Sequence, residues 1–164
     1  GTVPIAQCLA GPEAGAALLE LALDAGCAAL CAEATGCLQA VLERTVEYLR
    51  TRVQFGKRIG EFQVLQHRAV DMHVATEEAR SLAMLAALKM SAPVAERKAA
   101  VSAAKQRIGE LAHQVGEAAV QTHGGIGVTD ELDVAHYFKR LTMIDHWMGD
   151  SDFHLDRFRA ARAA

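Results

Sequence analysis

Aromatic residues and prolines are scarce in this sequence of 164 residues. Aromatic side chains make up 5% of the chain and only three prolines occur, whereas hydrophobic residues make up 51% and alanine is abundant. Strands favour aromatic and β-branched residues, while alanine favours helices. The composition therefore predicts close-packed helices over a sheet. A chain of this length makes one domain and can bury a sizeable core.

A strong charge of one sign is also missing. Lys and Arg together number 17 and Asp and Glu number 20, so the formal net charge is −3 and the signs are well mixed. The basic footprint of a nucleic-acid binder is therefore absent. No uninterrupted run of about 18 apolar residues occurs, and the first 20 positions lack the basic start of a secretory signal. We expect a soluble, cytoplasmic protein with no membrane span and no nucleic-acid partner.

Cysteine is confined to the first quarter of the chain, at Cys8, Cys27, Cys31 and Cys37. Cys27 and Cys31 are four residues apart on a predicted helix. No second thiol pair and no suitably spaced histidine follows to complete a zinc site. The pattern predicts small buried thiols in a reducing compartment and no metal site.

Apolar residues recur at spacings of three and four through most of the chain, which is typical of helices with one buried side. No segment shows a convincing period of two. The predicted segments are a connecting segment over 1–12, long helices over 13–51, 62–90 and 94–122, and shorter helices over 130–147 and 153–162. We predict an all-α domain over 13–164, an antiparallel bundle of three long helices with a broken fourth.

The long helices each have an apolar seam that is predicted to face the core. The seam residues of the first are Leu30, Ala34, Leu38, Val41, Thr45 and Leu49; of the second, Phe62, Leu65, Ala69, Met72, Thr76, Ala79, Ala83, Ala86 and Met90; and of the third, Val101, Ala104, Ile108, Leu111, Val115 and Ala118. Small seam residues favour close packing between helices.

The stretch 121–129 has few residues that favour helices and contains glycines at 124, 125 and 127. Glycine permits φ > 0 and lets backbone N–H groups approach a ligand closely. The alternative is a purely structural turn, in which Gly124 ends one helix and Thr129 is the N-cap of the next.

The loops that follow the first and third helices lie at the same end of an antiparallel bundle. The first contributes Arg52, Gln54, Phe55, Lys57 and Arg58, and the second contributes Gln121, His123 and the glycine amides. A guanidinium together with backbone amides suits a pyrophosphate. For Arg52 alone, an interaction with the C-terminal dipole of its helix is an equal explanation.

Three stretches, at 52–56, 62–72 and 121–127, together resemble the C-terminal helical domain of the acyl-CoA dehydrogenases. They are Arg-Val-Gln-Phe-Gly, Phe-Gln-Val-Leu-Gln-His-Arg-Ala-Val-Asp-Met and Gln-Thr-His-Gly-Gly-Ile-Gly. The resemblance covers nearly the whole chain, in the right order and at the right separations. It is closest to the bacterial branch that includes pimeloyl-CoA dehydrogenase small subunits and steroid side-chain dehydrogenases.

The resemblance implies a flavoenzyme that introduces an α,β double bond into an acyl-CoA thioester and passes electrons to an acceptor. A carboxylate removes the α-proton and the β-hydrogen leaves as hydride to the flavin of FAD. The resemblance implies that Arg52 and Gln63 of one subunit and the 121–125 loop of another bind the FAD, and hence a homo- or hetero-oligomer, a dimer or tetramer. The implied FAD contacts are Arg52, Gln54, Phe55, Gln63, Gln121, Thr122, His123, Gly124 and Gly125.

The sequence departs from this family where the catalytic base is expected. Met148 stands at the usual position of the glutamate, and Gly26 at the position that a minority of members use. Asp150 is the nearest substitute, and it is equally suited to start a helix. The resemblance also implies that Asp24 contacts the substrate, although Cys27 replaces a neighbouring arginine of the family.

Family members also contain an N-terminal helical domain and a middle β-domain, so we expect the chain to be an excised C-terminal domain. Because the glutamate is missing, a catalytically silent partner subunit remains an alternative function. A related flavin monooxygenase, which shares the same bundle, is another.

A further cluster of possible metal ligands consists of Asp145, His146, Asp150, Asp152 and His154. Two of them, Asp150 and His154, are four residues apart and could share a helix face. Without a third ligand at fixed spacing, a polar helix start explains it more simply than a metal.

Overall fold

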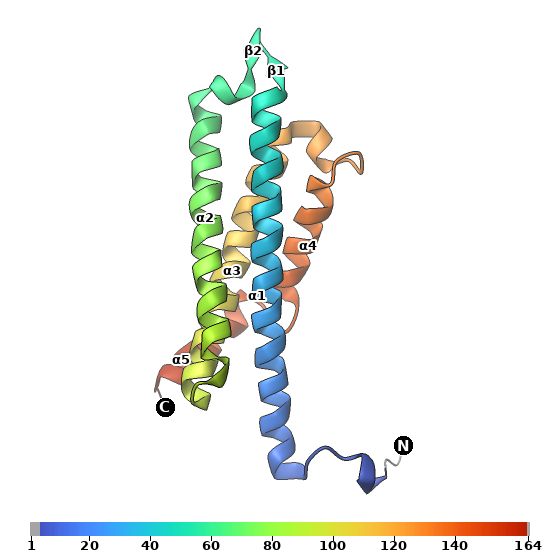
Figure 1. The fold of residues 1–164 in the computed structure, drawn as a ribbon, viewed down its shortest axis with the longest axis vertical. Helices are drawn as coiled ribbons and strands as arrows, with labels where there is room; N and C mark the ends of the chain where they lie inside the picture. The colour runs from blue at the N-terminus through green and yellow to red at the C-terminus, as the bar shows by residue number, and fades with distance from the viewer. Residues whose placement is uncertain (1–3, 164) are drawn as a thin grey trace.

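Three long helices and a divided fourth form an antiparallel bundle in the computed structural model, which describes residues 4–163 (Figure 1). The α-helices are α1 (Pro12–Thr51), α2 (Gln63–Leu88), α3 (Val94–His123), α4 (Val134–His146) and α5 (Ser151–Ala163). Short 3₁₀ turns lie at Ile5–Gln7, Ile59–Glu61, Lys89–Ser91 and Gly124–Val128. The predicted all-α bundle is therefore confirmed.

The core is centred on α3, which contacts each of the other four α-helices. All six predicted seam residues of α1 are buried, and so are the first five of α3. On α2 the middle of the seam is buried, from Met72 to Ala86, while its two ends are only partly covered. The prevalence of alanine along these seams lets the helices approach one another closely.

One predicted helix start is wrong, while the other four lie within two residues of the prediction. The first helix begins at Pro12, one residue before its predicted start. The fourth begins at Val134 and not at residue 130, because a turn precedes it. Thr129 is consequently not an N-cap, and its hydroxyl donates to the carbonyl of Ile126 at 2.9 Å.

A β-hairpin that the sequence pattern did not predict joins α1 to α2. Strands β1 (Val53–Gln54) and β2 (Lys57–Arg58) pair antiparallel, with Val53 opposite Arg58. Strands of two residues are too short to show a period of two. The hairpin lies at the same end of the bundle as the C-terminal end of α3 (Figure 1).

The N-terminal part of α1 extends past the rest of the bundle (Figure 1) and leaves Leu18, Leu19, Leu21 and Leu23 exposed. By length and composition alone, the segment Ala14–Thr51 could cross a membrane. It contains Glu20 and Asp24, which pair with cations of α3 and α5. The expectation of no membrane span, which is based on the missing apolar run, stays a prediction.

Candidate functional site

The loops after α1 and α3 meet at one end of the bundle, as the sequence predicts, and enclose a groove of about 300 Å³. Its lining includes seven predicted cofactor contacts: Arg52, Gln54, Phe55, Gln121, Thr122, His123 and Gly124. Gln63 and Gly125 are exposed but are not in this lining. The groove presents a guanidinium and two side-chain amides beside a glycine turn.

The hairpin turn holds an exposed phenylalanine in a left-handed backbone conformation. Phe55 has φ 54° and Gly56 has φ 79°, the signs that a tight two-residue hairpin turn requires. The Phe55 ring is 91% exposed and meets the Phe62 ring edge to face, with 6.1 Å between centroids. A bulky residue with φ > 0 is strained, and such strain is often found at ligand sites.

Two of the three glycines of the 121–129 stretch, Gly124 and Gly127, are required for different physical reasons. Gly124 ends α3 with φ 67° and ψ −145°, which side chains strongly disfavour, and a Cβ there would meet no atom within 4 Å. Gly127 is packed tightly, because a Cβ would lie 2.9 Å from the Val120 carbonyl oxygen. The helix end therefore needs glycine, and the space around Gly124 remains open for a ligand.

Thr122 and His123 are buried and anchor the loop. The Thr122 hydroxyl donates to the Ala118 carbonyl at 2.7 Å, and His123 Nδ1 lies 2.9 Å from the Ala119 carbonyl. The His123 ring also packs on Tyr48, with 4.4 Å between ring centroids. Both residues support the shape of the groove.

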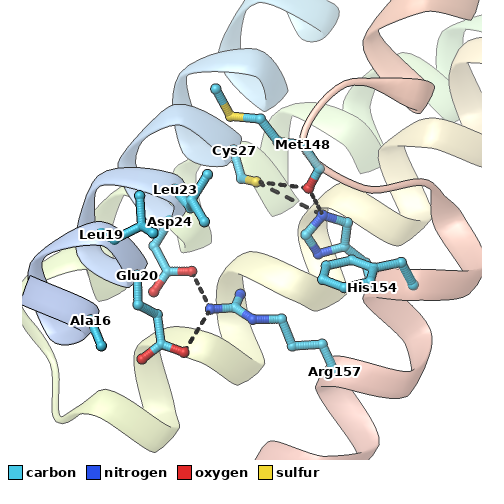
Figure 2. A pocket seen from close by; sticks show the side chains of 10 residues that line it. Ala16, Leu19, Glu20, Leu23, Asp24, Cys27, Met148, His154 and Arg157 are labelled. Atoms are coloured by element: carbon cyan, nitrogen blue, oxygen red, sulfur yellow. Dashed lines mark hydrogen bonds and ion pairs between the residues drawn. The ribbon is translucent and has the colours of Figure 1, made fainter. Parts of the chain in front are cut away.

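A second site lies between the N-terminal half of α1 and α5, where a cleft of about 280 Å³ opens (Figure 2). Asp24 lies beneath it, fully buried. Arg97 Nε donates to Asp24 Oδ2 at 2.8 Å, and Arg157 Nη2 lies 2.6 Å from Asp24 Oδ1 in an ion pair. Asp24 thus lines the cleft, but both of its oxygens are engaged by arginines; direct substrate contact remains a prediction.

The two positions at which the family places its base touch each other in space. A Cβ on Gly26 would lie 2.6 Å from Met148 Sδ, so the thioether lies directly over this glycine. Met148 has φ 59° and Gly149 has φ 104°. Apolar atoms consequently fill the place where either glutamate would stand.

Asp150 is exposed, and its Oδ1 accepts a hydrogen bond from the Phe153 amide at 2.9 Å. This is the geometry of an N-cap, so Asp150 caps α5, whose first residue is Ser151. The geometry favours the helix-start interpretation, and a role as base stays a prediction.

In residues 4–163, no group of three acidic, histidine or cysteine side chains could hold a metal ion.

The connection between α4 and α5 is held by buried donors. Lys105 Nζ donates to the carbonyls of Asp145 at 2.8 Å and Gly149 at 2.9 Å. His154 Nε2 lies 3.1 Å from the Met148 carbonyl, so this nitrogen carries the proton. Its Nδ1 then accepts from the Ser102 hydroxyl at 3.3 Å.

Burial, with a contribution from Lys105, lowers the pKa of His154 to about 4 and keeps the ring neutral. Burial also raises the pKa of Cys27, whose Sγ lies 3.8 Å from His154 Nε2. Because Nε2 holds a proton directed at a carbonyl, it cannot take one from the thiol. The pair is therefore not a nucleophile with its base.

The expectation of buried thiols holds for Cys27 and Cys31, and burial raises the pKa of Cys31 to about 12. It is wrong for Cys8, which is exposed, and only partly right for Cys37, which is half-buried. Cys8 lies outside the bundle, where no helix covers it.

Sequence reasoning missed Arg97, Lys105 and Arg157. The first two were detectable, since they lie four residues on either side of the buried Val101 and so share its helix face. A charged side chain on a buried helix face indicates that a group of opposite charge, or a hydrogen-bonding partner, lies opposite it. Arg157, on the short α5, gave no such signal.

The chain is similar to known proteins over most of its length. Residues 13–162 match the family described as Acyl-CoA dehydrogenase, C-terminal domain. An acyl-CoA dehydrogenase of Mycobacterium tuberculosis, IpdE2, is 38% identical over 71% of this chain and 35% of its own length. The structure of butyryl-CoA dehydrogenase from Megasphaera elsdenii matches with a TM-score of 0.82 and 31% identity, over 88% of this chain and 38% of that one.

A crystal structure of an FAD-dependent dehydrogenase matches with a TM-score of 0.79 and 32% identity, over 84% of this chain and 37% of that one. The chain thus spans little more than a third of the length of each of these relatives.

Proposed function

The chain belongs to the acyl-CoA dehydrogenase family, and on this premise we propose that it is the FAD-binding, oligomer-forming C-terminal domain of an enzyme that desaturates an acyl-CoA thioester. The enzyme would also contain an N-terminal helical domain and a middle β-domain, and would pass its electrons to a separate acceptor. The observation that carries the proposal is the groove in which Arg52, Gln54 and Phe55 meet the loop at Gln121.

The residues of the groove fit FAD. Arg52 offers a planar fork of donors to the anionic oxygens of a pyrophosphate. The amides of Gln54 and Gln121 add uncharged polar contacts, and the open space at Gly124 admits a ligand next to the backbone. When bound, FAD supplies the hydride acceptor of the reaction. A similar protein of known structure is itself an FAD-dependent dehydrogenase.

Two exposed apolar features support an oligomer. The Phe55 ring projects from the hairpin with most of its surface uncovered. The outward face of α2 has a stripe of exposed apolar residues at helical spacing, formed by Val70, Val74, Met84, Leu85 and Leu88. A face of this kind is typical of an interface with another subunit. We infer that a second subunit covers these surfaces and completes the cofactor site.

A second candidate function is a silent partner subunit, which contributes flavin contacts while another chain provides the base. The contact of Met148 with Gly26 favours it, because no carboxylate stands at either expected position. The carboxylates that do line the cleft, Glu20 and Asp24, are both in ion pairs.

The substitution Arg52→Ala in the full-length protein tests the proposed cofactor site. A hydrogen bond to a charged group contributes about 1.5–3 kcal/mol. We therefore expect the dissociation constant for FAD to rise roughly 10- to 100-fold, measured by flavin fluorescence or calorimetry. Arg50→Ala is the matched control, since Arg50 is an exposed arginine of the same helix end outside the groove. An unchanged dissociation constant in Arg52→Ala would overturn the assignment.

A further inference from the structure

The cleft between α1 and α5 has the size and rim of a site for a small apolar group. Its volume of about 280 Å³ is near the lower end of the roughly 300–1,000 Å³ typical of ligand pockets. Its rim consists of Leu19, Leu23, Met148 and Phe153, which are between 45% and 62% exposed. This space suits part of a ligand, such as an acyl group, and not a whole acyl-CoA.

The charged groups that line the cleft are already paired with one another or with their neighbours. Glu20 lies 2.6 Å from Lys98 Nζ, and Asp24 is shared by Arg97 and Arg157. Two carboxylates face one guanidinium in the lining itself. A carboxylate at the end of a bound chain would lose its hydration and gain no cation in return, because Arg157, Arg97 and Lys98 are already paired with these two acids, so its burial would have a large cost in free energy. The cleft therefore favours an uncharged occupant.

Met148 forms the wall of this cleft next to α1. Its backbone has a positive φ of 59°, and its carbonyl is fixed by His154. Figure 2 shows its side chain extending from the α4–α5 connection towards α1, beside Cys27. There the thioether lies over Gly26, a position at which any larger residue would displace it. The backbone is thus held while the flexible side chain sets the remaining space.

Building on the proposed function, we propose that this cleft binds the uncharged, apolar acyl group of the thioester and that Met148 is the specificity-determining residue that limits its size. A shorter side chain at 148 enlarges the cleft, whereas a methyl group at position 26 pushes the Met148 side chain into it. The pairing of the lining charges sets the preference for uncharged groups, so size and charge are selected by different residues.

The test is a set of calorimetric dissociation constants for the full-length protein with its flavin and any partner subunit. Octanoyl-CoA and its ω-carboxylated counterpart have the same chain length and differ in one charge. We expect octanoyl-CoA to bind about tenfold or more tightly than the carboxylated thioester. Equal affinity, or a preference for the carboxylate, would overturn the inference. If neither thioester binds, the proposed function fails together with it.

The size limit is tested with cyclohexylpropionyl-CoA, a bulkier thioester. We expect Met148→Ala to improve its affinity relative to octanoyl-CoA by about threefold or more. Met143→Ala is the matched control, because Met143 is also 46% exposed and does not line the cleft. A ratio of affinities that is the same in both variants would overturn the role of Met148.

The substitution Gly26→Ala tests the contact between position 26 and the Met148 side chain from the side of α1. Alanine favours helix over glycine, so the melting temperature should not fall. We expect octanoyl-CoA to bind several-fold more weakly and the double variant Gly26→Ala/Met148→Ala to recover the affinity. Loss of affinity in Gly26→Ala without recovery in the double variant would contradict the proposed contact.

Discussion

At the scale of single residues, buried polar groups in this protein hold one short segment, the connection between α4 and α5. Lys105 donates to the carbonyl of Asp145 in the last turn of α4 and to that of Gly149 in the connection, and His154 donates to the Met148 carbonyl. A buried donor that lost its acceptor would remain unsatisfied, which costs about 1–3 kcal/mol. These contacts keep Met148 in a backbone conformation that a free chain rarely adopts.

The lowered pKa of His154 makes stability depend on pH. An unfolded histidine has a pKa of about 6.5, so between pH 6.5 and 4 the unfolded chain binds more protons than the folded one. The contribution to the free energy of unfolding is fully present above pH 6.5 and is lost as the pH falls to about 4. Its size is roughly 3 kcal/mol. Urea unfolding across this range measures it.

The comparison with His154→Gln isolates this residue, because glutamine keeps a donor and an acceptor but does not titrate in this range. We expect the variant to lose less stability than the wild type between pH 6.5 and 4. His136→Gln replaces an exposed histidine and should follow the wild type. Parallel curves for all three proteins would contradict a neutral buried His154.

At the scale of helices and loops, the interiors of elements were easier to predict than their ends. The period of 3.6 residues placed every long helix and its buried side, because burial repeats along the whole element. The ends depend on single contacts. The bond from the Phe153 amide to Asp150 decides where α5 begins, whereas the sequence alone leaves Asp150 equally suited to start a helix or to act as a base.

Substitutions of Asp150 separate its two possible roles. Asp150→Ala should lower the free energy of unfolding by about 1 kcal/mol, since an N-cap is lost. Asp150→Asn should retain both the stability and the turnover of the full-length enzyme, because asparagine is also a good N-cap. Denaturant titration and a desaturation assay provide the two measurements. Loss of turnover in Asp150→Asn with stability intact would instead identify Asp150 as the base.

At the scale of the whole molecule, the sequence predicted the end at which the cofactor groove lies but not the second cleft. Antiparallel packing alone brings the loop with Arg52 next to the loop with Gln121. The cleft depends on pairs far apart in the chain, such as Asp24 with Arg97, 73 residues away. Periodicity shows which face of a helix is buried, but it does not show which charged residue of another helix will pair with a charge on that face.

The two sites lie in different parts of the same bundle, which suits a domain that holds a cofactor at one place and a substrate group at another. In the groove, Arg52 and the open space at Gly124 face solvent. In the cleft, Met148 and Phe153 are half uncovered. Both surfaces therefore need further protein to enclose a ligand, which agrees with a chain that spans little more than a third of its relatives.

The most direct measurement is the visible spectrum of the full-length protein, purified alone and titrated without oxygen with acyl-CoA thioesters. We expect a yellow protein whose flavin absorbance bleaches with an uncharged acyl thioester. Flavin that is retained only when a second subunit is co-expressed would favour the silent partner. Protein that binds no flavin under any of these conditions, or bound flavin that no thioester bleaches, would contradict the proposed dehydrogenase.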